Sequence, residues 1–245
     1  MKLNSFAAAI LGGLFTLQAG SVSAAELTKS DVEKIVREYL VSHPEILIEM
    51  SDALRAKQAA SQAEGDKALL KKYANTIYQQ ASDPVTGNAK GTMTIVEFVD
   101  YNCGYCKRST PFVEQLLKEH KDIRYIYKEF PILSDTSVYA SKVALAVHEF
   151  APEKYEPLHH AFMSHEGPLR TNKDVEAIVR SLNIDWAKVE DKLKDPAIEK
   201  KIAENHMLAQ TLAITGTPAF IIGDQLLRGA PQSYAQLSEL VKESQ

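Results

Sequence analysis

Residues 93–106 read MTIVEFVDYNCGYC, a run of β-branched and aromatic residues followed closely by both cysteines of the protein. A short apolar run of this composition predicts a buried central strand over residues 93–99. The cysteines form one C-x-x-C motif between that strand and a predicted helix, and in this context the spacing is typical of a redox-active pair. The motif therefore predicts thiol chemistry at the end of the strand.

Cys103 is expected at the N-terminus of the helix, where unpaired backbone N–H groups and the positive end of the helix dipole favour a thiolate. This position predicts a lowered pKa and makes Cys103 the nucleophile. Cys106 lies one turn inside the helix and within reach of Cys103. We expect it to be the resolving thiol, which closes a disulfide and releases a mixed-disulfide partner.

Three other roles for the cysteines stay open. A purely structural disulfide would close a very small loop and constrain the unfolded chain little. Zinc usually takes four ligands, so a zinc site would need histidines from the later helical segments. Those histidines lie in polar company and are expected to be solvated: His148, His159, His160 and His165. Copper binding by the two thiolates would compete with disulfide formation. The sequence favours a redox pair and no metal.

The segments after the motif predict an α/β fold. A helix is expected to about residue 120, then a β-rich segment at 123–130 and a long helical stretch over about 134–213. Residues 219–222, a turn and residues 225–228 predict a hairpin before a last helix. The predicted order is βαβ, a helical insertion, then ββα.

Upstream of the motif, residues 27–80 have a helical pattern. The pairs Ser30 with Glu33 and Ser42 with Glu45 predict two capping boxes, and the proline inside the second pair predicts a break between two helices. The second helix is expected to give way to a flexible or frayed connector that ends at Gly65, because the sequence there becomes polar and rich in Ala and Gln.

An apolar stripe precedes this connector at three- and four-residue spacings. Its members are Val32, Ile35, Val36, Tyr39, Ile46, Leu47, Met50 and Leu54. A stripe on about 30 residues cannot form a core alone, so it must pack on the following domain or on another copy of the chain. We favour a homo-oligomer, with a trimer favoured over a dimer, and keep packing within the chain as the alternative.

Residues 1–24 predict a secretory signal peptide, with Lys2 at its charged start and small residues before a cut after Ala24. We therefore expect a soluble protein in an oxidising compartment, the periplasm, after cleavage. The 245 residues have a globular composition, with 45% hydrophobic and 24% charged residues. A net charge of −4 without any basic run gives no indication of a nucleic-acid partner.

These features resemble the thioredoxin superfamily and, within it, the DsbA family of secreted thiol:disulfide oxidoreductases, over residues 92–240. The resemblance is carried by Val96-Glu97-Phe98 ahead of the C-x-x-C motif, by Lys128-Glu129-Phe130-Pro131, by the helical insertion and by Thr217-Pro218 before a strand. It implies a thioredoxin fold with a helical insertion, preceded by a helical extension.

The resulting domain prediction has three parts: a signal peptide at 1–24, a helical oligomerisation segment and linker at 25–65, and a DsbA-like catalytic domain at 66–245. The resemblance also implies that Pro218 is the cis-proline beside the active-site disulfide, and that the backbone of Thr217 pairs with an extended substrate. Gly104 and Tyr105 are the other expected substrate contacts. No cofactor is expected besides the redox-active disulfide Cys103–Cys106.

Glu97 interrupts the apolar strand, and a carboxylate there is costly unless it is paired or protonated. It matches the buried acid of the superfamily, and the resemblance implies that it relays a proton to or from Cys106. A solvated side chain at the edge of the sheet is the alternative. Lys128 is a candidate charge partner.

Two features depart from the best-known DsbA pattern. Gly-Tyr stands between the cysteines where that archetype has Pro-His, so thiolate stabilisation by an imidazole is absent. The amphipathic extension resembles the ScsC-type branch, whose members are oligomeric disulfide isomerases or redox-maintenance proteins. The resemblance implies unfolded or misoxidised exported proteins as substrates, and a membrane redox partner that is a DsbD- or ScsB-like reductase or a DsbB-like oxidase. The alternatives are a DsbA-type dithiol oxidase and a copper-binding or holdase module.

Overall fold

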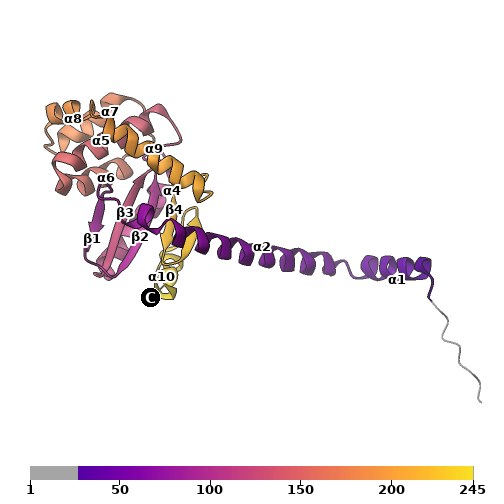
Figure 1. The fold of residues 1–245 in the computed structure, drawn as a ribbon. Coiled ribbons are helices and arrows are strands. Elements are labelled where there is room, and N and C mark those ends of the chain that lie inside the picture. The colour runs from indigo at the N-terminus through magenta and orange to yellow at the C-terminus, as the bar shows by residue number, and fades with distance from the viewer. Residues whose placement is uncertain (1–26, 245) are drawn as a thin grey trace, which may run out of the picture. The chain divides into compact units, whose positions relative to one another are not determined.

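The computed structural model describes residues 27–244, so the predicted signal segment at 1–24 lies outside the described residues (Figure 1). The chain divides into two units, Met1–Arg55 and Ala56–Gln245. The boundary between the units follows Arg55 and falls inside helix α2 (Glu45–Lys72). The predicted connector ends ten residues later, at Gly65. No helix among residues 27–244 is long and apolar enough to cross a membrane.

The first unit contains helix α1 (Lys29–Ser42) and the start of α2. The capping box of α1 is formed by Thr28 and Asp31 rather than by the predicted Ser30 and Glu33, because Thr28 has the extended backbone of an N-cap and accepts from the Asp31 N–H. The predicted break before Pro44 is confirmed. Ser42 does not cap α2, since its hydroxyl donates back to Glu38 O at 2.7 Å.

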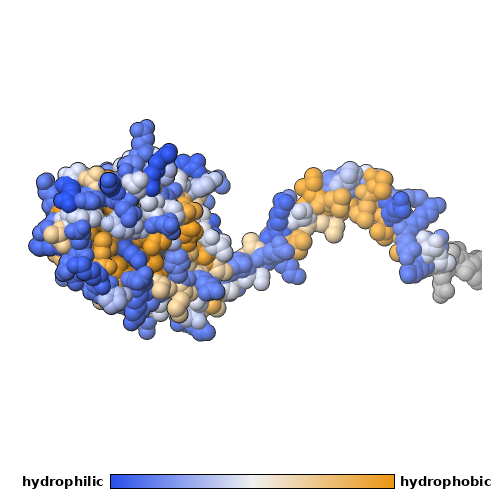
Figure 2. All heavy atoms as spheres, turned by 90° about the horizontal axis from the view of Figure 1, so that it is seen from above, coloured by the Kyte–Doolittle hydropathy of each residue, from blue (hydrophilic) through white to orange (hydrophobic). Residues whose placement is uncertain are grey.

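The apolar stripe of this unit is exposed to solvent. Helix α1 has no buried residue, and the exposed fractions of Ile35, Tyr39 and Leu47 are 54%, 55% and 66%. Figure 2 shows apolar side chains gathered along these helices. A contiguous apolar surface of this kind is unusual on a chain that works alone.

The predicted flexible connector is wrong, because α2 continues as one helix through residues 55–66. Ala, Gln, Lys and Glu dominate this segment and are strong helix formers, which outweighs the polarity that suggested a linker. Within the second unit, the end of α2 is anchored by Asp66, which accepts two hydrogen bonds of 2.7 Å from the guanidinium of Arg228. Leu70 is buried one turn later.

The second unit is built on a five-stranded sheet with the order β1-β3-β2-β4-β5. The strands are β1 (Val85–Gly87), β2 (Met93–Val99), β3 (Ile123–Glu129), β4 (Ala219–Ile222) and β5 (Gln225–Arg228). Strands β2 and β3 are parallel, and the other pairs are antiparallel. The strands that the sequence predicted are confirmed, and the structure adds β1, which the sequence did not predict.

Helices surround this sheet in Figure 1. They are α3 (Ala74–Tyr78), α4 (Gly104–Glu119), α5 (Asp135–Phe150), the 3-10 helix η1 (Pro152–Lys154), α6 (Tyr155–Ser164), α7 (Asn172–Ser181), α8 (Trp186–Lys192), α9 (Pro196–Thr211) and α10 (Tyr234–Glu243). The helical insertion is therefore confirmed as α5 to α9. The predicted α/β fold class, preceded by an N-terminal helical region, is confirmed as well.

Alternation along β2 creates two hydrophobic cores, one on each face of the sheet. Ile95 and Val99 face the core shared with α4, α10 and the insertion. Val96 and Phe98 face the core shared with the end of α2, α3 and α9. Glu97 has the parity of Ile95 and Val99, so the fold directs its carboxylate to the face on which α4 packs.

Candidate active site at the start of helix α4

The C-x-x-C motif lies at the junction between the central strand and helix α4. Strand β2 ends at Val99, and Cys103 is the N-cap residue of α4, with an extended backbone at φ −77° and ψ 112°. The Cys103 sulfur accepts a hydrogen bond from the Cys106 N–H at 3.4 Å, as an N-cap side chain does. The structure thus places the outer thiol where the sequence predicted it.

Two thiols of opposite character result from this arrangement. The pKa of Cys103 is lowered to about 6, first by the hydrogen bond with the Cys106 thiol and then by Thr217 and nearby backbone N–H groups, against the opposing effect of burial. The pKa of Cys106 is raised, mainly by burial and then by its contact with Cys103 and the charge of Glu97. Both thiols are free in the structure, and near neutral pH only Cys103 ionises.

The segment before β4 closes the other side of the site. The Thr217–Pro218 peptide bond is cis, as the resemblance implied. The backbone oxygen of Thr217 lies 3.1 Å from the Cys103 sulfur, and its hydroxyl is buried without a hydrogen-bond partner. Residues far apart in sequence therefore meet at the reactive sulfur.

The dipeptide between the cysteines faces outward. A side-chain carbon built at Gly104 would meet no other atom within 4 Å, so space beside Cys103 is open. Tyr105 is 60% exposed, and the Arg108 guanidinium stacks on its ring, 4.1 Å from the centroid. The two expected substrate contacts thus border the accessible side of the site.

Asp100 and Asn102 hold the loop before Cys103, and the sequence analysis assigned neither of them a role. The Asp100 carboxylate accepts from the Asn102 N–H at 2.8 Å and from the backbone N–H groups of Ile132 and Leu133 at 2.8 and 3.0 Å. The Asn102 side-chain oxygen accepts from the Leu169 N–H at 2.7 Å. The signal was present, since Asp and Asn directly after a strand are typical turn-forming residues.

Glu97 is buried, which excludes the alternative of a solvated carboxylate at the sheet edge. Its Oε2 atom accepts from the Tyr125 hydroxyl at 2.7 Å. Burial raises the pKa of Glu97 to about 8, the Tyr125 hydrogen bond opposes this rise, and the charges of Cys103 and Glu129 add to it. Glu97 is therefore a carboxyl group that changes protonation state near neutral pH.

The predicted pairing of Lys128 with Glu97 is wrong. In the sheet register Lys128 lies opposite Phe98, so it points to the other face. There its ammonium donates to Thr76 O at 3.0 Å and pairs with Asp83. Tyr127, not Lys128, lies opposite Glu97, and this difference of one residue places the two charges on opposite faces of the sheet.

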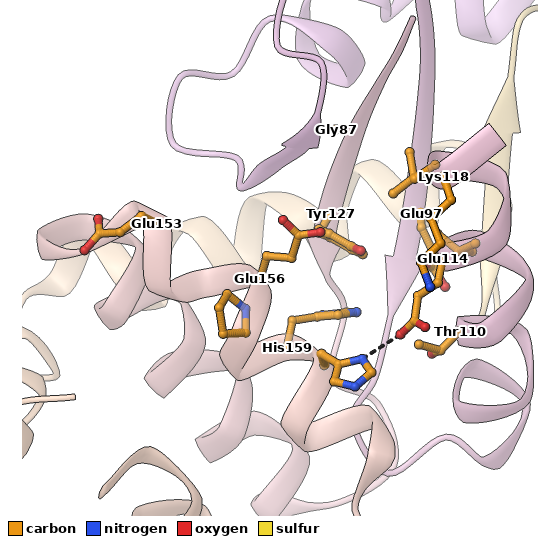
Figure 3. Close-up of a pocket in the computed structure, with 13 residues that line it drawn as sticks. Gly87, Glu97, Thr110, Glu114, Lys118, Tyr127, Glu153, Glu156 and His159 are labelled. Atoms are coloured by element: carbon orange, nitrogen blue, oxygen red, sulfur yellow. Dashed lines mark ion pairs between the residues drawn. The ribbon is translucent and has the colours of Figure 1, made fainter. Parts of the chain in front are cut away.

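A cavity of about 610 Å³ opens beside Glu97 (Figure 3). Tyr127 and His159 also line it, and an ion pair of 2.5 Å between Glu114 and His160 lies on its wall. The expectation that the histidines are solvated is wrong for His159, which is buried against the Tyr127 ring with a pKa lowered by burial to about 3. Among residues 27–244, no group of three His, Cys, Asp or Glu side chains is placed to hold a metal ion.

Residues 94–242 match the DSBA-like thioredoxin domain, which is more than half of the chain. The chain belongs to this family. Residues 29–61 separately match the N-terminal domain of the copper resistance protein ScsC. The predicted likeness to a DsbA-family oxidoreductase of ScsC type is therefore confirmed.

Solved structures agree with this assignment. The thiol-disulfide exchange protein alpha-DsbA2 from Wolbachia pipientis is 34% identical, with a TM-score of 0.70 over 76% of this chain and 98% of its own. The catalytic domain of Proteus mirabilis ScsC is 32% identical, with a TM-score of 0.67 over 73% of this chain and 97% of its own.

A curated relative is much longer than this chain. The Na(+)/H(+) antiporter NhaA 3 of Salinispora tropica is 28% identical over 160 residues, which are 65% of this chain and 24% of the antiporter. The chain thus spans about a quarter of the length of that protein.

Proposed function

We propose that this protein is a thiol:disulfide interchange protein that acts on cysteines of exported proteins in the periplasm. The single observation that carries the proposal is the pairing of an ionisable, N-capping Cys103 with a buried Cys106 that stays protonated. A thiolate near pH 7 is the nucleophile of disulfide exchange, and the protonated neighbour is kept for the second step. The predicted signal peptide and the DsbA-like family support the location.

In the first step the Cys103 thiolate attacks one sulfur of a substrate disulfide. A Cys103–substrate disulfide forms, the substrate disulfide breaks, and its second sulfur leaves as a thiolate. A substrate thiolate can then displace Cys103, which isomerises the substrate. Alternatively Cys106 attacks Cys103, which forms the Cys103–Cys106 disulfide and leaves the substrate reduced; the reverse sequence oxidises a dithiol.

The second route needs a proton acceptor, because Cys106 is buried and its pKa is raised. We assign this role to Glu97, whose carboxylate takes the proton from Cys106 as Cys106 attacks. In the reverse direction protonated Glu97 returns the proton to the departing Cys106 sulfur. A pKa of about 8 suits a group that must carry out both transfers near neutral pH.

Substrate recognition is proposed at the open side of Cys103. The backbone beside the sulfur at Thr217 can pair with an extended segment, in the β-addition mode. Gly104 leaves room for that segment, and the adjacent Tyr105 exposes an aromatic side chain to it. Backbone pairing with few side-chain requirements suits unfolded or misoxidised proteins of many sequences.

Self-association through the apolar stripe favours isomerisation over simple oxidation. The stripe is exposed and lies in the segment that matches the ScsC N-terminal domain. Several active sites in one homo-oligomer, proposed as a trimer, would hold a substrate through successive exchanges by raising the effective concentration of thiolates. A membrane reductase that keeps the pair as thiols completes this function, whereas a membrane oxidase would convert the protein to a dithiol oxidase.

Replacing the nucleophile tests the proposal. Cys103→Ser is expected to abolish the refolding of a scrambled disulfide substrate, while Cys106→Ser is expected to accumulate mixed disulfides that migrate as larger species without reductant. A non-catalytic holdase would survive Cys103→Ser, and a copper-binding module would lose metal affinity in both variants. Unchanged refolding by Cys103→Ser would overturn the catalytic assignment.

A further inference from the structure

A second carboxylate is buried near the active site, and the exchange steps above do not use it. Glu129 lies at the end of β3 with no exposed surface. Its Oε1 atom accepts from the hydroxyls of Tyr101 and Tyr155 at 2.6 and 2.7 Å, and its Oε2 atom accepts from the Ser141 hydroxyl at 2.6 Å. Three donors and no cation surround the carboxylate, which is an unusual environment for a purely structural charge.

A chain of polar atoms connects Glu129 to the cavity beside Glu97. The Tyr101 oxygen, which binds Glu129, lies 3.3 Å from Nδ1 of His159. His159 lines the same cavity as Glu97, and Figure 3 shows its side chain extended toward the side on which Glu97 lies. Both buried carboxylates are therefore connected to the same cavity, Glu97 directly and Glu129 through Tyr101 and His159.

The charged and titratable groups around Glu129 come from four elements besides its own strand. They are Tyr101 and Asp100 after β2, Glu97 on β2, Ser141 on α5, and Tyr155 and His159 on α6, with Tyr127 on β3 itself. Asn205 on α9 donates to the Glu129 backbone oxygen at 3.0 Å. Burial raises the pKa of Glu129 to about 7, so it titrates close to Glu97.

We propose that Glu129 is a second proton-holding site, which exchanges protons with the cavity through Tyr101 and His159 and thereby sets the charge that Glu97 experiences during disulfide exchange. Glu129 is a positioning residue, since it acts through Glu97 and does not touch the sulfurs. The inference rests on the proposed function.

The proposed transfer from the cavity to Glu129 conserves the number of protons. A proton from the cavity binds Nε2 of His159 while Nδ1 gives its proton to the Tyr101 oxygen, and the Tyr101 hydroxyl proton passes to Glu129. One proton leaves the cavity, one arrives at Glu129, and His159 and Tyr101 both end neutral. An ionised Glu129 raises the pKa of Glu97, so its protonation makes Glu97 a readier proton donor.

The electrostatic part is tested with Glu129→Gln in the full chain. The rate at which dithiothreitol reduces the Cys103–Cys106 disulfide is measured against pH, corrected for ionisation of the reagent. In the wild type this rate falls as Glu97 loses its proton near pH 8. Glu129→Gln is expected to move this midpoint down by about 0.5 pH unit or more. Glu129→Asp, which keeps the charge, is expected to keep the wild-type midpoint, and an unchanged midpoint in Glu129→Gln would overturn the inference.

The path is tested by a matched pair of variants. Tyr101→Phe and Tyr155→Phe each remove one hydroxyl donor to the same Glu129 oxygen. Both rings pack near His159, but only the Tyr101 hydroxyl lies within hydrogen-bond distance of Nδ1 of His159. Proton uptake during reduction is followed with a pH-indicator dye in a stopped-flow instrument. Tyr101→Phe is expected to slow uptake about 10-fold relative to Tyr155→Phe. Equal rates in the two variants would overturn the path.

These outcomes are separate from a failure of the proposed function. All four variants keep both cysteines, so absence of any exchange in the wild type would refute the function itself. Exchange with an unshifted midpoint and equal uptake rates would refute only the role of Glu129. Thermal unfolding of each variant identifies any that does not fold, and the tyrosine pair still decides the question if Glu129→Gln is one of them.

Discussion

The two units of this chain depart from the usual rules of burial in opposite directions. Helix α1 and the start of α2 leave apolar side chains in solvent, with Ile48 and Met50 exposed by 67% and 61%. The second unit instead buries carboxyl groups, with Glu97 in an apolar part of β2 and Glu129 at the end of β3. Each departure costs free energy in an isolated chain.

This difference indicates what each unit needs for its function. An exposed apolar stripe lowers its free energy when another surface covers it, so we expect the first unit to act together with a partner. A buried carboxyl lowers its free energy by keeping its proton, so the second unit depends on a protonation state. We therefore expect the state of the first unit to depend on protein concentration and the state of the second unit to depend on pH.

The largest effect is expected from removing the first unit. Deleting residues 27–55 is expected to reduce the mass measured by light scattering from an oligomer to one chain, because the stripe is lost while the second unit keeps its core. Refolding of scrambled substrates should be lost, and oxidation of a simple dithiol should remain. Ile35→Ser changes a residue of the apolar stripe and is expected to weaken assembly far more than the control Arg37→Ser, which changes a residue of the same helix outside the stripe. An unchanged mass after the deletion would contradict self-association.

Glu97→Gln tests the second unit. Formation and opening of the Cys103–Cys106 disulfide are expected to slow by roughly 10²-fold, because the amide cannot transfer the Cys106 proton. Glu114→Gln, on the wall of the same cavity, is the control and should change little. Equal rates in the two variants would show that the buried acid has no part in the reaction.

The same substitution changes how stability depends on pH. The pKa of Glu97 is raised from 4.5 to about 8, so the folded chain holds a proton that the unfolded chain loses in this interval. The contribution of Glu97 to the free energy of unfolding therefore falls as pH rises through this window. Urea titrations should show Glu97→Gln gaining stability relative to the wild type from pH 5 to pH 8, by a few kcal/mol; a constant difference would contradict the raised pKa.

The smallest effect concerns the end of α2. Arg228→Lys loses the two-pronged contact with Asp66 and is expected to lower the free energy of unfolding by about 1 kcal/mol. The measured quantity is the urea midpoint at constant slope, and the thiol pKa values should not change. A wild-type midpoint would show that this pair does not anchor α2.

The sequence was most informative where a local pattern determines the structure. The strand at residues 93–99 and the position of Cys103 at a helix start follow from short-range composition and spacing, whereas the burial of Glu97 is implied by the family resemblance. The capping box formed by Thr28 was missed because two overlapping Ser/Thr-x-x-acid patterns compete at that helix end. At residues 55–66 the polar composition predicts a flexible connector, but strong helix formers keep the segment within α2.

Other features depend on contacts that no local pattern encodes. Lys128 was given the wrong partner because one position in a strand changes the face of the sheet. His159 was expected in solvent because its sequence neighbours are polar, yet the fold packs it against Tyr127. Glu129 follows Lys128 in a strand that also holds Arg124, so the sequence does not single it out, and only the structure shows the three hydroxyls that donate to it.

The central claim is that Cys103 ionises readily while Cys106 does not. The most direct measurement is the rate of Cys103 alkylation by iodoacetamide in the reduced full chain, followed against pH by mass spectrometry. We expect a single midpoint near pH 6 and no modification of Cys106 in the folded protein. A midpoint near about 8.5, the value of an unperturbed thiol, or equal labelling of both cysteines would contradict the account.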